Sequence, residues 1–279
     1  MLISRRPIAP LTALVDTLWA SERGAMPHAR EANLPTGRVD IVIPLLAHQV
    51  ITRFTSADDA QGERFQGAVI QGAQDRVHLR DTHMASAVVG VHFKPGGAAA
   101  FFGGALPELH NRTVLLDELW GPSVHVLREE LQETRSPHDR LLRVEAYLMA
   151  RLQHAAPADA MVMAALRTLA QQPGSALIEP VQRASGCGTT QFISRFERSV
   201  GLTPKRYARV LRFHALIQTL ALETPQDWAL TAAEAGYADQ SHLIHEFKRL
   251  AGMVPSAYRA VAPDHPTHVV APAFPRRRE

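Results

Sequence analysis

Two stretches of the chain place polar and charged side chains on one face of a predicted helix, opposite an apolar face. The apolar face comes from Phe192 and Phe196 in the first stretch and from Leu243 and Phe247 in the second. Apolar residues at i and i+4 form the inward side of a helix. The outward sides, rich in groups that can hydrogen-bond to a partner, consist of Thr189, Thr190, Ile193, Ser194 and Glu197, and of Gln240, Ser241, His242, Ile244, His245 and Lys248.

The two stretches are copies of one repeated unit, because glycine, proline and aromatic residues recur at a constant offset. Agreement at residue types that set turns and cores indicates that the same local structure occurs twice. The pairs that lie 51 residues apart are Phe196 and Phe247, Gly201 and Gly252, Pro204 and Pro255, and Tyr207 and Tyr258.

Each copy is predicted to form a short helix, a glycine turn and a second helix. Gly186 and Gly236 follow short helical stretches, where a left-handed residue lets the chain reverse sharply. Asp239 is a good N-cap for the second helix of the later copy, and Gly188 takes that place in the earlier one. This order of elements makes a helix-turn-helix, so the sequence predicts two recognition helices.

The segment between the copies, 204–222, has the apolar spacing of a helix. Its 19 residues would span about 28 Å, and one turn of DNA is ~34 Å long. Such a spacer can hold two recognition helices in successive major grooves of double-stranded DNA. Thr203 caps this helix before Pro204, whereas Val254 precedes the matching proline, so Val254→Thr is predicted to stabilise the protein by roughly 1 kcal/mol.

These residues resemble the C-terminal domain of the AraC family of bacterial transcription regulators, which has seven helices and two helix-turn-helix units. The resemblance covers residues 160–260, and the second copy, GYADQSHLIHEFKRLAGMVPSAYR, is the stronger match. It implies sequence-specific binding of double-stranded DNA to regulate transcription. It also implies which residues face the bases, namely Thr190, Ile193 and Ser194 in the first unit and Gln240, Ser241, Ile244 and His245 in the second.

Particular DNA contacts follow from these side chains. Gln240 can form two hydrogen bonds with adenine, and Ile193 or Thr190 can pack against a thymine methyl group. The family usually has arginine where this chain has Ser194 and His245, so the bases that are read do not carry over. Candidate phosphate contacts, with a solvated helix face as the alternative for each, are Lys205, Arg206, Arg209, Lys248 and Arg249.

Two further arginines are not counted among the DNA contacts. Arg195 follows Ser194 directly, so it points to a different side of the helix. Arg212 lies within the spacer helix, where we expect an internal ion pair.

The first hundred residues predict a different architecture, in which short strands form a sandwich or barrel. The runs 41–43, 68–70 and 87–93 are β-branched or apolar and are bounded by glycine and proline. Helical spacing then appears over 123–132 and 138–153. The predicted fold is therefore α+β with two domains: a β-rich domain with trailing helices over 1–155, an all-α domain over 160–262, and a disordered basic tail over 263–279.

Three short segments of the first domain, 34–38, 93–98 and 119–121, resemble the cupin-like N-terminal domain of one subgroup of the same family. In that family such domains sense ligands or mediate dimerisation. The resemblance therefore implies a small-molecule effector, a second copy of the chain and RNA polymerase as candidate partners, and it names no effector.

The composition is consistent with this division. The chain has 279 residues, is 46% hydrophobic and carries a formal net charge of +3. Residues 1–159 have a net charge of −2 and residues 160–279 one of +5, as expected for a polyanion-binding module joined to another domain. No apolar run approaches the ~18 residues of a membrane span, and the one cysteine excludes a disulfide framework. We expect a soluble, cytoplasmic protein with no cofactor, metal or membrane partner.

Two alternatives to a DNA-binding regulator stay open. A cupin-type metalloenzyme could use His78, His83 and His92, although the chain lacks a His-x-His pair followed by a suitably spaced glutamate. No catalytic triad, Walker loop or dinucleotide motif appears, so we expect no enzyme activity. A helical protein-interaction module is the other alternative, and it would lack the steep salt dependence of DNA binding.

The cysteine and the tryptophans are predicted to pack rather than to react. Cys187 occupies the position before a helix cap, which an apolar residue normally fills. Trp19, Trp120 and Trp228 are expected in the core or between domains, with a pocket-lining role as the alternative for Trp19.

Overall fold

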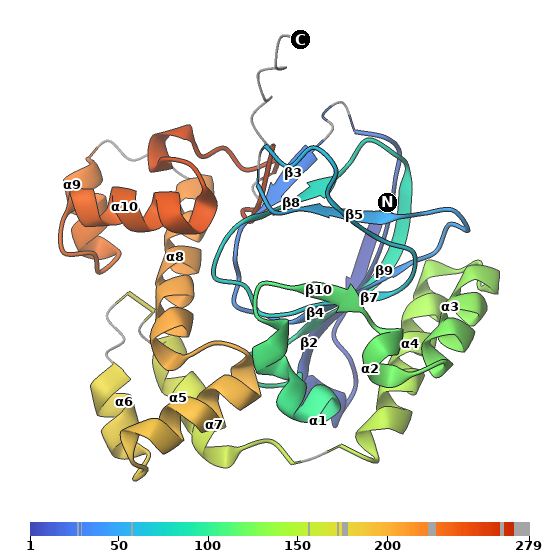
Figure 1. Ribbon diagram of the computed structural model, residues 1–279, viewed down its shortest axis with the longest axis horizontal. Coiled ribbons are helices and arrows are strands. Elements are labelled where there is room, and N and C mark those ends of the chain that lie inside the picture. Colours follow the sequence, from blue (N-terminus) through green and yellow to red (C-terminus); the bar gives the residue numbers. More distant parts are fainter. Residues whose placement is uncertain are drawn as a thin grey trace.

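The chain folds into a β-rich unit followed by a helical unit, which confirms the predicted α+β fold with two domains. The computed structural model describes residues 1–26, 28, 30–56, 58–155, 157–171, 173–174, 178–222, 227–262 and 265–270. Figure 1 shows the strands in the middle, with helices α2, α3 and α4 on one side and helices α5 to α10 on the other.

The strands form two antiparallel sheets, as the sandwich-or-barrel prediction requires. The six-stranded sheet has the order β1 (Leu2–Arg5), β2 (Val15–Arg23), β9 (Ser86–Phe93), β4 (Asp40–Pro44), β7 (Val69–Gln71) and β10 (Thr113–Leu115). The five-stranded sheet has the order β11 (His268–Val270), β3 (Arg30–Asn33), β8 (His78–Asp81), β5 (Ile51–Phe54) and β6 (Glu63–Phe65).

The helices begin within the β-rich unit and continue through the rest of the chain. The first group comprises η1 (Leu11–Ala13), α1 (Ala99–Phe102), η2 (Gly103–Leu109), α2 (Asp117–Trp120), α3 (Ser123–Glu133) and α4 (Pro137–Leu152). The second comprises α5 (Ala160–Gln171), α6 (Ile178–Ala184), α7 (Thr189–Val200), α8 (Pro204–Leu222), α9 (Trp228–Glu234), α10 (Gln240–Ala251) and η3 (Pro255–Ala257). Among the described residues, no helix is both long and apolar enough to cross a membrane.

The six-stranded sheet has one apolar face, because successive side chains of a strand point to opposite faces. Ile41 and Ile43 of β4 and Val91 of β9 are fully buried on that face. Helix α4 packs beside β1 and β2 and buries Leu141 and Leu148. The helices trailing the strands therefore cover this face, while the other face turns toward the five-stranded sheet.

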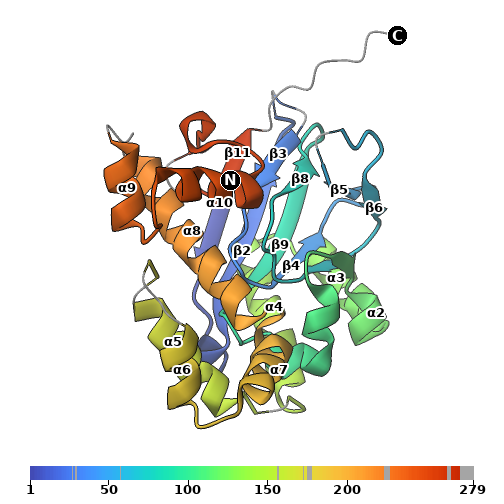
Figure 2. The same cartoon turned by 60° about the vertical axis from the view of Figure 1, so that its left-hand side comes forward.

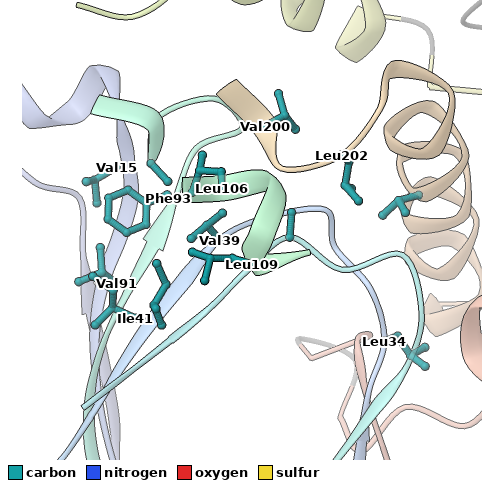
Figure 3. Packing of buried hydrophobic residues seen from close by; sticks show 14 of the residues in the cluster. Val15, Leu34, Val39, Ile41, Val91, Phe93, Leu106, Leu109, Val200 and Leu202 are labelled. Carbon is teal, nitrogen blue, oxygen red and sulfur yellow. The ribbon is translucent and has the colours of Figure 1, made fainter. Parts of the chain in front are cut away.

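The two units share one continuous apolar core. Helix α7 packs on η2, and Leu106 of η2 is buried between Phe93 of β9 and Val200 of α7 (Figure 3). Gly201 ends α7 with φ at +83°, and a Cβ there would lie 3.1 Å from the carbonyl oxygen of Leu106. A glycine is therefore required at this contact, both for the left-handed turn and for the close approach of the two units.

The predicted disordered tail is wrong for residues 268–270. They form β11, which pairs antiparallel with β3 in the register His268 to Asn33 and Val270 to Glu31. Figure 2 shows β11 beside β3 at the edge of the sheet, behind α10. Val269 is buried, and the Tyr258 hydroxyl donates a hydrogen bond to the carbonyl oxygen of Pro266 at 2.7 Å. The free edge of β3 thus orders this segment, whereas residues 263–264 and 271–279 lie outside the described part.

A Val254→Thr substitution is expected to stabilise the protein, as the sequence predicts, although by less. Val254 is the N-cap of η3, a single turn, whereas Thr203 caps the 19-residue helix α8 and accepts a hydrogen bond from the Arg206 amide. We therefore expect a gain of about 0.5 kcal/mol, the low end for a cap. Chemical denaturation measures it, with the exposed Val261→Thr as the control; equal effects of both substitutions would contradict a capping role.

Candidate nucleic-acid interface

The first helix-turn-helix unit consists of α6 and α7, joined by a turn at Gly186 with φ at +68°. Gly188 is the N-cap of α7 and supplies no side-chain hydrogen bond. Phe192 and Phe196 are fully buried on the inward side of α7, with ring centroids 6.0 Å apart. The predicted turn, weak cap and inward stripe are confirmed.

The second unit repeats this arrangement with α9 and α10. Gly236 makes the turn with φ at +77°. The Asp239 carboxylate caps α10 by accepting a hydrogen bond from the His242 amide at 2.7 Å. Leu243 and Phe247 are fully buried, as predicted. A carboxylate at this position also interacts favourably with the positive end of the helix dipole.

Helix α8 holds both recognition helices through aromatic contacts, one near its N-terminal end and one at its middle. Tyr207 lies 5.7 Å from Phe196 of α7, and Phe213 lies 5.1 Å from Phe247 of α10, measured between ring centroids. The predicted spacer coincides with α8, Pro204–Leu222. Figure 1 shows α10 near one end of α8 and α7 near the other. The spacer is therefore one continuous helix that contacts both recognition helices.

All seven side chains predicted to face the bases are exposed, and so are Thr189 and His242 on the same outward sides. The apolar ones among them, Ile193 and Ile244, keep 38% and 36% of their surface accessible. An exposed isoleucine on each recognition helix is available for a thymine methyl group. The exposed set is Thr189, Thr190, Ile193, Ser194, Gln240, Ser241, His242, Ile244 and His245.

The five predicted phosphate contacts divide into two classes. Lys205, Lys248 and Arg249 are exposed. Arg209 is partly buried, and its Nε lies 2.7 Å from Oε2 of Glu246 on α10. Arg206 contacts the β-rich unit, with its Nε 3.6 Å from Oδ2 of Asp75 and its Nη1 3.2 Å from Nδ1 of His110.

Asp75 is the acidic residue that engages Arg206 across the domain contact. Burial alone would raise the pKa of Asp75, but hydrogen bonds from His110 and Asn111 and the charges of His110 and Arg206 outweigh it. The pKa of Asp75 therefore lies well below its ordinary value, and the carboxylate stays ionised near neutral pH. Asp75 could not be predicted from the sequence, because no local pattern links positions 75 and 206.

Arg195 fulfils the prediction that it points away from the base-facing side. Its Nε and Nη2 bind the two carboxylate oxygens of Asp159, each at 2.7 Å. Asp159 also accepts hydrogen bonds from the Met161 and Val162 amides at the start of α5. Arg195 thus fastens α7 to the segment that enters the helical unit.

Arg212 differs from its prediction. It forms no ion pair within the described part of the chain, and its guanidinium lies 5.4 Å from the ring centroid of Tyr237. Arg212 therefore makes a cation–π contact with the second unit instead of an ion pair with an acid. Arg198 is a further candidate for a DNA contact, because it is exposed on α7 one turn after Ser194, and the i+4 spacing in the sequence was the signal for it.

The residues of the metal-site alternative have other partners. His92 Nδ1 lies 2.7 Å from Oδ1 of Asp40, His78 contacts Gln71 and Asn33, and His83 is exposed. Over the described ranges, no three histidine, cysteine, aspartate or glutamate side chains form a group that could hold a metal ion. Cys187 is partly buried against the core, where an apolar residue was expected.

Comparisons with known families assign the two units separately. Residues 182–260 match a helix-turn-helix domain family, and residues 4–115 match a domain family of unknown function, DUF6597. No curated protein matches the chain.

Solved structures with low identity are similar to much of the chain. ToxT from Vibrio cholerae is 10% identical, with a TM-score of 0.46 over 86% of this chain and 97% of that one. Unsaturated fatty acid bound ToxT from Vibrio cholerae strain SCE256 is 11% identical, with a TM-score of 0.46 over 91% and 96%. The AraC-like transcriptional activator CuxR is 15% identical, with a TM-score of 0.27 over 78% and 86%.

Because those TM-scores are low, the assignment depends on the helix-turn-helix match and on the two units that it spans. The match begins within α6 and ends after η3, so it includes both recognition helices and α8. Residues 182–260 therefore form a helix-turn-helix domain that contains both recognition helices and α8.

Proposed function

We propose that the chain is a transcription regulator of the AraC type, in which α7 and α10 enter successive major grooves on one side of a duplex and their exposed side chains read the bases. The observation that supports this most directly is the pair of aromatic contacts by which α8 holds the two helices. At about 1.5 Å per residue, α8 spans about 28 Å, close to the ~34 Å turn of DNA. Lys205, Lys248 and Arg249 contact phosphates, which orients the domain without specifying sequence.

The β-rich unit, 1–155 with β11 added, is proposed as the sensor or dimerisation domain. An effector there changes the orientation or availability of the recognition helices, because the two units share a core at η2 and α7. A second copy of the chain and RNA polymerase are the further partners in this proposal. The chain acts in the cytoplasm on promoter DNA and catalyses no reaction.

A Gln240→Ala variant is expected to lose specific DNA binding while keeping nonspecific binding. The side chain is exposed at the start of α10, and a bidentate amide contact with adenine contributes about 1–3 kcal/mol of discrimination. The operator is first selected from random DNA fragments with the full chain. Affinity is then measured on that operator and on a scrambled duplex of equal length.

The matched control is Gln153→Ala, which removes an exposed glutamine outside the helix-turn-helix domain. It should leave both affinities unchanged. An equal loss on the operator and on the scrambled duplex in the Gln240 variant would contradict base reading by α10.

An Asp75→Asn substitution is expected to increase the affinity for nonspecific DNA. It removes the charge that engages Arg206 in the domain contact and frees that guanidinium for a phosphate. One additional phosphate contact makes the plot of log K against log salt steeper by about 0.9. Asp58→Asn, an exposed site with the same charge change, is the control. If both variants steepen the plot equally, general charge and not Arg206 is responsible.

A further inference from the structure

A cavity of about 1380 Å³ lies between the two sheets of the β-rich unit. Residues of both sheets line it, and His214 and Gln218 of α8 and the segment 265–268 complete its wall. A molecule inside would therefore touch the sensor domain, the helix that carries both recognition helices, and the strand that follows them. Nothing in the DNA-binding function uses this space.

The lining of the cavity combines apolar residues, such as Val42 and Phe54, with many polar ones, although a protein interior is normally apolar. On β4 and β9 the side chains of Ile41 and Val91 face the apolar core, whereas Asp40 and His92 line the cavity. A small barrel without a ligand is usually filled by its own side chains. The five-stranded sheet adds further polar groups to the lining, namely Glu31, Asn33, Arg53, His78, Arg80 and His268.

Four of the lining residues have buried polar atoms that form no hydrogen bond within the described part of the chain. These atoms are Nε1 of Trp19, Oδ1 of Asn33, Nε of Arg38 and Nε of Arg53. Buried polar groups without a partner are exceptional in native proteins and call for a specific reason. Three of the four are donors, so they fit a ligand rich in acceptors, and Asn33 Oδ1 fits a ligand that also donates.

Among the charged side chains that line the cavity, the guanidinium of Arg53 has no acidic partner within the described residues. Arg53 of β5 stands directly opposite Arg80 of β8, and like charges in that register destabilise a sheet. Arg80 is paired with Glu31, and Asp40 with His92. Burial and the charge of Arg80 lower the pKa of Arg53 to about 9, so it is still a cation at neutral pH. Within the described residues no acid forms an ion pair with Arg53.

Trp19 covers one wall of the cavity and lies flat on the sheet. A Cβ at Gly90 of β9 would come within 2.2 Å of the indole ring, so only glycine admits the ring there. The indole stacks on the His92 ring with centroids 5.4 Å apart. The expectation that Trp19 packs in the core is therefore wrong, and its pocket-lining alternative is confirmed.

We infer that this cavity binds a small hydroxylated carboxylate, with the carboxylate on Arg53 and hydroxyl groups on Trp19, Arg38 and Asn33. The inference rests on the proposed function in one respect, because it treats this ligand as the effector of the β-rich unit. A neutral polyol would leave the Arg53 guanidinium without a counter-charge. A carboxylate on a long apolar tail would leave the buried polar atoms of Trp19, Arg38 and Asn33 without hydrogen-bond partners.

The test measures binding to the full chain by calorimetry, without DNA, so its failure is separable from failure of DNA recognition. The probes are D-gluconate, D-galacturonate and quinate, with D-glucitol as the neutral analogue and decanoate as the apolar one. We expect at least one hydroxylated carboxylate to bind roughly tenfold or more tightly than D-glucitol and decanoate.

Arg53→Gln should weaken that binding roughly tenfold or more, and it should keep or raise the melting temperature of the unliganded protein, because it removes the repulsion with Arg80. A structural arginine would lower the melting temperature instead. Arg76→Gln, exposed outside the cavity lining, should leave affinity unchanged. The inference is overturned if no hydroxylated carboxylate binds better than D-glucitol, if decanoate binds best, or if Arg53→Gln leaves the affinity intact.

Discussion

A Phe247→Ala variant is expected to be less stable than the wild type by about 3–5 kcal/mol, the usual cost of deleting a buried aromatic ring. Phe247 has no exposed surface, and its ring centroid lies 5.1 Å from that of Phe213 and 6.0 Å from that of Tyr258. Removing the ring opens the contact that holds α10 on α8, so specific DNA binding should fall with stability. Urea denaturation and operator binding measure the two effects.

His245→Ala on the same helix is the matched control with the opposite outcome. His245 is exposed, so its removal should change the free energy of unfolding by less than about 0.5 kcal/mol. Operator binding should nevertheless weaken, because the imidazole belongs to the proposed base-reading face. A stable Phe247→Ala protein with normal operator affinity would refute the role given to the aromatic contact.

Acidification from pH 7 to pH 5 is expected to destabilise the contact between β11, α8 and the β-rich unit. Burial lowers the pKa of His268 to about 3, and the charges of Arg80, His265 and His92 act in the same direction. The charge of Glu31 raises this pKa, but its effect is outweighed. Burial and the charge of Arg38 lower the pKa of His214 to about 4. Both imidazoles are therefore neutral in the folded protein over this range, whereas in the unfolded chain they take up protons below about pH 6.5.

The stability contributed by these histidines is present above pH 6.5 and is lost as the pH falls toward their folded pKa values. The loss between pH 7 and pH 5 is about 2 kcal/mol for each histidine. The carboxylates with lowered pKa, such as Asp75, lose their contribution only near and below pH 4, so they do not obscure this window. Urea denaturation at both pH values measures the change.

His268→Gln should reduce that pH dependence by about 2 kcal/mol, whereas His83→Gln, at an exposed site, should leave it as in the wild type. A pH dependence that is identical in all three proteins would show that His268 does not titrate on unfolding.

The helix-turn-helix units were predictable because their signals are local. Gly186, Gly201 and Gly236 have positive φ angles where the repeat demands them, and Asp239 caps its helix within three residues. Each of these turns and caps depends on residues a few positions away, so a short stretch of sequence is enough to predict it. The bounds of α8 could be predicted for the same reason.

The strands of the β-rich unit were harder to predict because the inner face of this barrel is polar. Alternation of apolar and polar residues predicts a strand with a solvated outer face, and β3 and β8 instead alternate between a buried face and a charged cavity. Trp19 was harder to predict for the same reason, because a tryptophan suggests core packing whereas this one lines the cavity. The pairing of Asp75 with Arg206 depends on the docking of two domains, which no local pattern encodes.

The position of β11 in the chain has a consequence for synthesis. The strand at the edge of the five-stranded sheet is synthesised after the whole helix-turn-helix domain. Until then the edge of β3 has free backbone amides and carbonyls, which can pair with other nascent chains. The sheet is therefore complete only after the helix-turn-helix domain has been synthesised, and a polypeptide that ends before residue 268 would keep the edge of β3 unpaired.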